Sequence, residues 1–190
     1  MDMILASGSP RRKELLTQMG LSYRVMVSDA DETVDPSLSP NRQVTLISRR
    51  KAEAVAAETG PDPLIIAADT IVALEDQVMG KPHSEGEAIR MLTHLQGKTH
   101  QVYTGLTLLQ GGREETHVEC TAVTFRPMTE AEIEAYVASG EPMDKAGAYG
   151  IQGLGGMFIK GIQGDYFNVM GLPICALGAA LKTFGVEVMG

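Results

Sequence analysis

The sequence has 190 residues and a mass of 20.3 kDa, which suits one domain of about 150 residues or two small lobes that share a core. Hydrophobic residues make up 44% and charged residues 21% of the chain, so a disordered protein is excluded. The cysteines, Cys120 and Cys175, are too few for a disulfide scaffold or a zinc site built from cysteine. The formal net charge of −8 leaves no basic surplus for general nucleic-acid binding.

The N-terminus and the apolar runs predict a soluble cytoplasmic protein with neither nucleic acid nor membrane as a partner. Residues 1–4 have no basic region and no long apolar run behind them, so we do not expect a secretory signal. The weakly polar run at 169–181 is shorter than the roughly 20 residues that a membrane-spanning helix needs.

The first half of the chain alternates apolar strands with amphipathic helices. Ser9 followed by Pro10 is typical of a helix start, and Gly20 is typical of a helix end. The predicted elements are, in chain order, a strand at 3–6, a helix from Ser9 to Gly20, a strand at 23–27, an acidic loop at 29–39, a helix from Ser39 to Gly60, and a strand run at 64–74 that Asp69 and Thr70 interrupt.

The second half adds a hairpin and three further helices. Two capping boxes, Ser84 with Glu87 and Thr129 with Glu132, mark helix starts. The predicted elements are a turn at 80–82, a helix from Ser84 to Gly97, a hairpin of strands at 101–109 and 115–126, a helix from Thr129 to Gly140, a glycine-rich loop at 140–164, and a helix at 174–184 that buries Cys175. This alternation predicts an α/β fold with a mixed sheet.

Four residues around the first helix start form a candidate anion site. Ser7 and Ser9 supply hydroxyls, Arg11 and Arg12 supply guanidinium groups, and backbone N–H groups point out of the helix start. Acidic residues would suit the positive end of the helix dipole better. That conflict favours a bound anion, and the alternative is a solvated basic first turn.

Asp69 is a second candidate, because it follows the apolar run 64–68 and so is expected at the end of a buried strand. An unpaired carboxylate is costly to bury, so Asp69 requires a cation, a hydrogen-bond network or a metal ion. The alternative is an ordinary turn aspartate. Glu32 lies in the acidic run 29–32, whose oxygen atoms suit Mg²⁺ or Mn²⁺ but are also typical of a solvated face.

Two lysines complete the candidate set. Lys51 follows Arg49 and Arg50 on a predicted helix, so only some of the three side chains can face inward, and we interpret the arginines as solvated or structural. Lys81 lies in a Gly-Lys-Pro turn that can aim its ammonium group. Taken alone, each lysine is more typical of an exposed surface position than of a binding site. The glycine segments 97–99 and 153–155 lack the remaining glycines of a P-loop or a dinucleotide fingerprint.

The chain resembles the Maf family of nucleoside triphosphate pyrophosphatases along nearly its whole length. The segments that carry the resemblance are LASGSPRR at 5–12, ADTIV at 68–72, GKP at 80–82, HQVYTG at 100–105, DKAGAYGIQG at 144–153 and VMGLP at 169–173. The resemblance implies a single domain over 1–190, with a curved mixed sheet flanked by helices and two lobes around a cleft, as in inosine triphosphate pyrophosphatases. It also implies a homodimer.

The resemblance further implies that a nucleoside triphosphate is cut between its α and β phosphates by metal-assisted attack of water, with Mg²⁺ or Mn²⁺ as cofactor. Asp69 matches the catalytic proton acceptor, and Glu32 matches the acid that shares the metal and water with it. The basic residues around the phosphates are matched by Arg12, Lys51 and Lys81, and the serines of the phosphate loop by Ser7 and Ser9. The residues that set the substrate branch are matched by Arg11, Thr70 and Gln152. The last three resemble the branch that acts on dTTP and UTP.

Two alternatives stay open at this stage. One is a regulatory protein that binds a nucleotide or a division partner, since the family name is tied to septum formation. The other is the same enzyme acting on a different base, either 7-methyl-GTP or a modified pyrimidine nucleotide.

Overall fold

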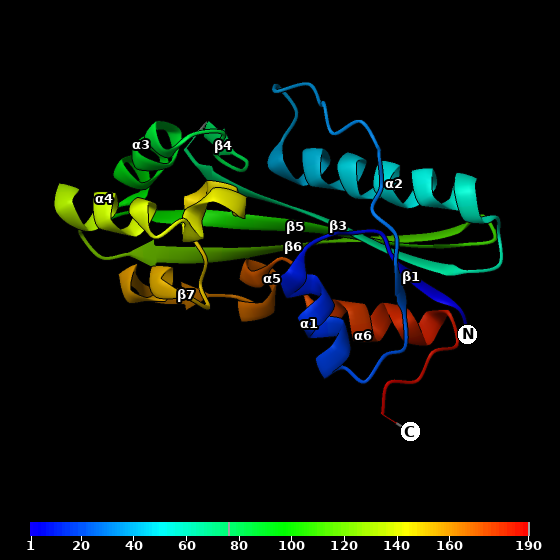
Figure 1. The fold of residues 1–190 in the computed structure, drawn as a ribbon. Coiled ribbons are helices and arrows are strands. Elements are labelled where there is room, and N and C mark those ends of the chain that lie inside the picture. Colours follow the sequence, from blue (N-terminus) through cyan, green and yellow to red (C-terminus); the bar gives the residue numbers. More distant parts are fainter. Residues whose placement is uncertain (76, 190) are drawn as a thin grey trace. The chain divides into compact units, whose positions relative to one another are not determined.

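Figure 1 shows the fold in a computed structural model, which describes residues 1–75 and 77–189. The chain divides into two compact units. Unit 1 comprises Met1–Asp69, Thr104–Glu119 and Gly171–Gly190, and unit 2 comprises Thr70–Tyr103 and Cys120–Met170. Strands β3, β5 and β6 contribute residues to both units.

The order of the elements follows the predicted alternation. The strands are β1 (Met3–Leu5), β2 (Arg24–Val25), β3 (Leu64–Leu74), β4 (Gln77–Met79), β5 (Thr99–Gln110), β6 (Arg113–Phe125) and β7 (Ile159–Gln163). The α-helices are α1 (Pro10–Gln18), α2 (Pro40–Thr59), α3 (Glu85–Leu95), α4 (Glu130–Ala138), α5 (Tyr166–Met170) and α6 (Ile174–Thr183). Three short 3₁₀ helices cover Glu141–Asp144, Ala146–Ala148 and Leu154–Phe158.

The strands form a mixed sheet, which confirms the predicted fold class. Its order is β2-β1-β3-β5-β6-β7, and β4 pairs with β3 beside this path. β1 runs parallel to β2 and β3, whereas β4 is antiparallel to β3 and β7 is antiparallel to β6. β1 is buried along its whole length, as expected for a short apolar strand in the parallel part of a sheet.

One hydrophobic cluster of unit 1 lies between α2 and the central strands. Ala52 and Val55 of α2 pack with Ile4 of β1 and Ile65 of β3. Gly105 of β5 lies directly under α2, because a Cβ atom there would overlap the Val44 carbonyl group. The missing side chain therefore lets the helix pack against the backbone of the strand.

Unit 2 contains an aromatic cluster in its core and a half-buried carboxylate, that of Glu141. The rings of His100, Phe125 and Tyr149 meet edge to face at centroid distances of 4.8–5.3 Å. The Glu141 carboxylate accepts hydrogen bonds from the backbone N–H groups of Leu154 and Gly155, at 2.8 and 3.0 Å. It also accepts one from the Tyr136 hydroxyl at 2.8 Å.

Several local predictions need correction. β3 is continuous, so Asp69 lies within the strand and not at its end. The predicted loop at 140–164 contains β7 and the three 3₁₀ helices. Cys175 is exposed on α6 and not buried. Ser84 caps α3 as expected, but the Glu87 carboxylate accepts from the His83 N–H at 2.8 Å and not from its own cap residue.

The capping box of Thr129 and Glu132 is complete, as predicted.

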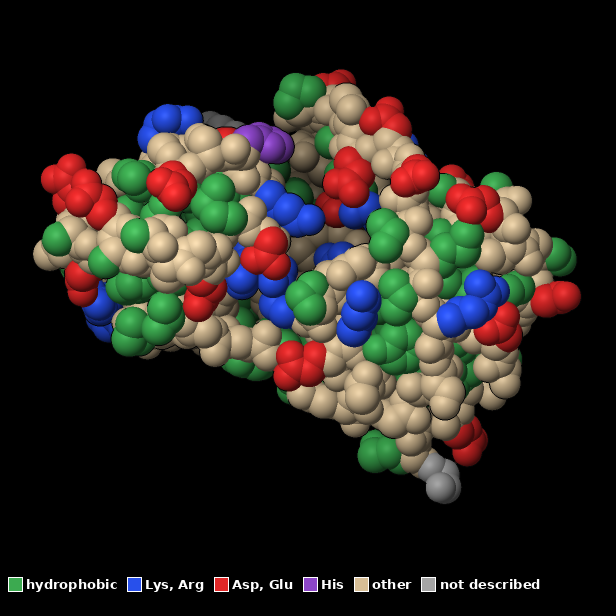
Figure 2. Space-filling model, in the orientation of Figure 1, with side chains coloured by type: hydrophobic (Ala, Val, Ile, Leu, Met, Phe, Trp, Pro, Cys, Tyr) green, Lys and Arg blue, Asp and Glu red, His purple; other side chains and the backbone are tan. Residues whose placement is uncertain are grey.

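Figure 2 shows acidic side chains distributed over much of one face, with basic side chains among them. Within the part of the chain that the structure describes, no helix has the length and apolar character to cross a bilayer.

Candidate active site

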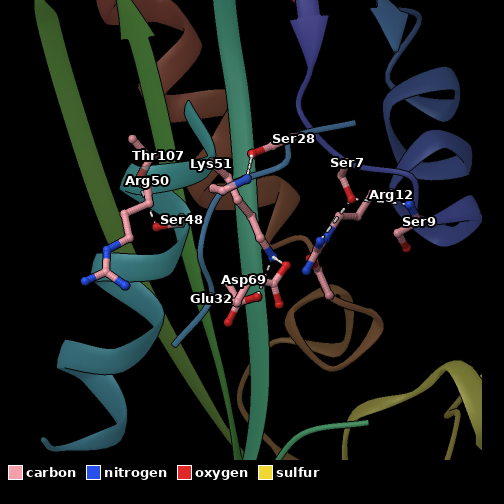
Figure 3. Close-up of polar contacts among 12 residues, drawn as sticks. Ser7, Ser9, Arg12, Ser28, Glu32, Ser48, Arg50, Lys51, Asp69 and Thr107 are labelled. Atoms are coloured by element: carbon pink, nitrogen blue, oxygen red, sulfur yellow. Dashed lines mark hydrogen bonds and ion pairs between the residues drawn. The ribbon is translucent and has the colours of Figure 1, made fainter. Parts of the chain in front are cut away.

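The loop between β1 and α1 is organised around the Ser7 hydroxyl. Its oxygen accepts hydrogen bonds from the Ser9 backbone N–H at 3.2 Å and from Nη1 of Arg12 at 3.1 Å (Figure 3). Ser9 occupies the N-cap position of α1, but its side chain makes no capping hydrogen bond. Ser7 therefore fixes both the turn and the guanidinium group in front of the helix start.

Arg12 is buried, although it lies in the first turn of α1. Its Nε donates to the Gly171 carbonyl oxygen at 2.7 Å, which ties α1 to the segment before α6. Burial lowers the pKa of the Arg12 guanidinium to about 10, and the negative charges of Asp69 and Glu32 partly oppose this change. Arg12 thus stays protonated at neutral pH and is a fixed positive charge that both carboxylates sense.

Lys51 of α2 joins the two acidic candidates. Its Nζ lies 2.7 Å from Oδ1 of Asp69 and 3.0 Å from Oε1 of Glu32 (Figure 3). The Lys51 and Asp69 side chains are 12% and 11% exposed, whereas that of Glu32 is 61% exposed. Lys51 is the cation that offsets the cost of holding a carboxylate inside a buried strand.

The position of Lys51 follows from the packing of α2. One turn earlier, Ser48 is fully buried, and its hydroxyl lies 2.8 Å from that of Thr107 on β5. Together with the close approach at Gly105, this contact fixes the rotation of the helix. Lys51 is therefore the basic residue of the run 49–51 that pairs with Asp69, and Figure 3 shows its side chain pointing toward that carboxylate.

The two arginines beside Lys51 have other contacts. Arg49 pairs with Glu53 on its own helix and with Glu114 of β6. Arg50 donates through Nη1 to the backbone carbonyl oxygens of Asp31 and Thr33. The interpretation of Arg49 as a structural or solvated residue agrees with these exposed ion pairs, whereas the contacts of Arg50 surround a candidate site residue, Glu32.

The structure thus brings together Ser7, Ser9, Arg12, Glu32, Lys51 and Asp69, all within unit 1. Arg11 is half-buried on α1. The other candidates belong to unit 2: Thr70 is half-buried in β3, and Lys81 and Gln152 are exposed in connecting segments. Their proposed roles remain predictions from the sequence.

The carboxylates of this cluster fit a cation that arrives with a phosphate ligand. Among the described residues, no group of three or more His, Cys, Asp and Glu side chains is arranged to hold a metal ion. Glu32 and Asp69 supply two carboxylates at one ammonium group. Mg²⁺ is commonly held by one or two carboxylates, with substrate phosphates and water as further ligands.

A mixed-sheet α/β protein with an arginine–serine loop beside a lysine-bridged pair of carboxylates has the parts needed to bind a phosphorylated substrate and to orient water. The chain matches the family model of Maf-like proteins over residues 2–184, and it belongs to that family. This match confirms the resemblance seen in the sequence motifs.

The curated relatives match over nearly the whole chain. A dTTP/UTP pyrophosphatase of Bacillus cereus (strain AH820) is 50% identical over 186 residues, covering 98% of this chain and 97% of the relative. A dTTP/UTP pyrophosphatase of Moorella thermoacetica is 51% identical over 191 residues, covering 99% and 97%. A solved nucleoside-triphosphatase / dITP/XTP pyrophosphatase from Mycobacterium abscessus aligns with a TM-score of 0.46 at 14% identity, covering 97% of this chain and 96% of that one.

Proposed function

We propose that this protein hydrolyses dTTP and UTP to the nucleoside monophosphate and pyrophosphate. Relatives that are 50% and 51% identical over almost the entire chain carry this activity in their names. The structural observation that carries the proposal is the Lys51 ammonium group, which joins the buried Asp69 carboxylate to Glu32 within the electrostatic reach of Arg12.

Binding of the triphosphate is the first task of the site. A nucleoside triphosphate carries about four negative charges, and the chain itself has a net charge of −8. Local positive charge must therefore hold the substrate. Arg12 is preorganised for this role, because its guanidinium is already fixed by Ser7 and the Gly171 carbonyl. We assign Arg11, Lys51 and Lys81 to the same phosphate-binding group, with Ser7 and Ser9 as hydroxyl donors.

Water then attacks the α phosphorus. The water oxygen bonds to that phosphorus, the bond from the phosphorus to the α–β bridging oxygen breaks, and pyrophosphate leaves. Asp69 accepts the proton from the water, while Glu32 orients the water. The fixed charge of Arg12 and the ammonium group of Lys51 stabilise the negative charge that develops on the leaving group.

We also propose a divalent cation, Mg²⁺ or Mn²⁺, held by Glu32 and Asp69 together with phosphate oxygens. When bound, it supplies positive charge at the reacting phosphate. Choice of base falls to Arg11, Thr70 and Gln152 by resemblance, and the amide of Gln152 offers both a donor and an acceptor to the edge of a pyrimidine. Modified pyrimidine nucleotides belong to the same substrate class.

We also propose a homodimer, which the family resemblance implies, and a location in the cytoplasm, which the sequence features predict. The mass of the chain is 20.3 kDa, so light scattering of the purified protein separates a dimer from a monomer directly. A monomer at all concentrations would overturn the proposed assembly without affecting the proposed chemistry.

A substrate panel tests the function. The purified protein with Mg²⁺ is given dTTP, UTP, CTP, GTP, ATP, ITP and 7-methyl-GTP, and pyrophosphate and orthophosphate are measured separately. We expect pyrophosphate from dTTP and UTP and little product from the purine nucleotides. Release of orthophosphate alone would place cleavage at the terminal phosphate and contradict the mechanism. Saturable binding without turnover would instead favour a regulatory nucleotide-binding protein.

A further inference from the structure

The guanidinium group of Arg50 lies beside the backbone that carries Glu32. Its Nη1 donates to the carbonyl oxygen of Thr33 at 2.6 Å and to that of Asp31 at 3.2 Å. These two carbonyl groups belong to the residues on either side of Glu32. One nitrogen atom on α2 therefore holds the backbone on both sides of the candidate acid.

The loop around Glu32 has little packing to hold it in place. Asp31, Glu32 and Thr33 are all exposed. A local turn forms where the Asp31 carboxylate accepts from the Thr33 N–H at 2.8 Å. This hydrogen bonding to Thr33 lowers the pKa of Asp31, and the charge of Arg50 adds a smaller effect in the same direction. Ordering such an exposed segment costs backbone entropy, so contacts from a rigid element matter here.

The ion pair with Lys51 fixes only the carboxylate end of Glu32. That side chain is 61% exposed, and a single ion pair at such an exposed position contributes little. Arg50 fixes the other end, at the backbone. Because Arg50 and Lys51 are consecutive residues of the same helix, the packing that aims Lys51 at Asp69 also sets the position of Arg50.

We propose that Arg50 is a positioning residue for the hydrolytic reaction: it holds the 31–33 turn so that Glu32 meets Lys51 and Asp69. This inference rests on the proposed function, in which Glu32 takes part in hydrolysis. Arg50 acts through the loop, and the phosphate-binding role stays with Arg12, Lys51 and their partners. Figure 3 shows Arg50 pointing away from Asp69, while Lys51 points toward it.

A double-mutant cycle tests this role, with Arg50→Ala, Glu32→Gln and the double variant compared with the wild type in dTTP hydrolysis. We expect Arg50→Ala to lower kcat about tenfold, with little change in KM, because the displaced group takes part in the reaction step. In the Glu32→Gln background, the same change has less than about a twofold effect, since the residue that it positions is already inactive.

Arg49→Ala is the matched control, because Arg49 is the preceding residue of α2 and its ion pairs lie away from the 31–33 turn. We expect it to keep wild-type kcat. Arg50→Lys restores part of the loss, since an ammonium group can donate to one of the two carbonyl oxygens. Hydrogen exchange gives a readout without turnover: the Thr33 amide should exchange faster in Arg50→Ala than in Arg49→Ala.

Two results would overturn the inference. One is unchanged kcat and unchanged Thr33 exchange in Arg50→Ala. The other is a loss of kcat from Arg50→Ala that has the same factor in the Glu32→Gln background as in the wild type. That result would mean that Arg50 acts independently of Glu32. If Glu32→Gln itself keeps wild-type turnover, the assignment of Glu32 under the proposed function fails. Faster Thr33 exchange in Arg50→Ala would then still support the contact with the turn.

Discussion

The Lys51 cluster of unit 1, formed by Glu32, Lys51 and Asp69, and the Glu141 contacts of unit 2 hold a carboxylate in opposite ways. Asp69 is paired with the end of a long, charged side chain, which also serves Glu32. Glu141 is held by two backbone N–H groups and a neutral hydroxyl. Burial raises the pKa of Glu141, but the hydrogen bonds from Gly155, Leu154 and Tyr136 and the charge of Lys145 together lower it further, so the net change is downward.

This difference separates a carboxylate that can react from one that supports a loop. The partner of Asp69 is a flexible ammonium group that can turn to a phosphate, which leaves the carboxylate oxygens available to water or a cation. Glu141 has each oxygen bonded to a rigid donor, and it connects α4 to the segment beyond Gly153. The first arrangement favours chemistry, and the second favours a single backbone conformation.

The largest effect that distinguishes the two arrangements is expected at Asp69. Asp69→Asn keeps the shape of the side chain but removes the proton acceptor, so dTTP turnover should fall about a thousandfold. The fold should persist, since Lys51 keeps its pair with Glu32. Steady-state kinetics and thermal unfolding measure both properties. Asp62→Asn is the control, because Asp62 is exposed in the same unit. Turnover of Asp69→Asn at the wild-type rate would remove Asp69 from the mechanism.

Glu141 should show the reverse pattern, with a larger effect on stability than on chemistry. Glu141→Ala removes the acceptor for two N–H groups and for the Tyr136 hydroxyl, which should cost about 3 kcal/mol of unfolding free energy. Chemical denaturation measures the change. Glu134→Ala is the control, because Glu134 is an exposed acid on α4, the helix that carries Tyr136. Unchanged stability in Glu141→Ala would show that these hydrogen bonds do not support the segment.

The sequence predicts the charged arrangement better than the backbone one. Asp69 stands out because an acidic residue inside an apolar run is unusual, and the need for a cation, a hydrogen-bond network or a metal ion follows from its burial. Which of Arg49, Arg50 and Lys51 supplies that cation depends on the rotation of α2, which the contact with Gly105 and Thr107 sets across long sequence distances. The hydrogen bonds of Arg50 to the backbone beside Glu32 depend on the same rotation, so the sequence does not predict them either.

The glycine-rich segment at 140–164 shows a structural feature that the sequence does not predict. Its composition predicts an irregular backbone, but the structure contains β7 and 3₁₀ helices there. A Cβ atom at Gly153 would overlap the Glu141 carboxylate, and one at Gly155 would overlap the Tyr136 hydroxyl. These glycines make room for residues 12 to 19 positions earlier in the chain, and no local pattern reveals such a requirement.

The packing of α2 gives a smaller effect that connects fold and chemistry in unit 1. Gly105→Ala places a methyl group against the Val44 carbonyl, so the helix must move, at a cost of about 2 kcal/mol. Because α2 also carries Lys51, turnover should fall together with stability. Gly178→Ala on α6 is the control, since that position has open space and should be as stable as the wild type or slightly more so. If Gly105→Ala retains both properties, this contact does not fix the helix.

The smallest expected effect is a pH dependence that arises in unit 2. Burial lowers the pKa of His100 to about 4, and its Nε2 lies 2.7 Å from the Tyr149 hydroxyl. Below the ordinary histidine pKa of about 6.5, the unfolded chain binds a proton that the folded chain does not bind until about pH 4. This histidine therefore reduces stability as the pH falls through that window, by about 1 kcal/mol between about pH 7 and pH 5.5.

His100→Gln should remove this contribution, so the stability difference between the wild type and the variant should shift by that amount over the same pH range. Denaturation at several pH values measures it, and carboxylates that titrate in both proteins cancel in the difference. His83→Gln is the matched control, because His83 is an exposed histidine of the same unit. A parallel pH dependence in the wild type and His100→Gln would mean that His100 is protonated inside the fold, and that the aromatic cluster of unit 2 tolerates a charge as the Lys51 cluster does.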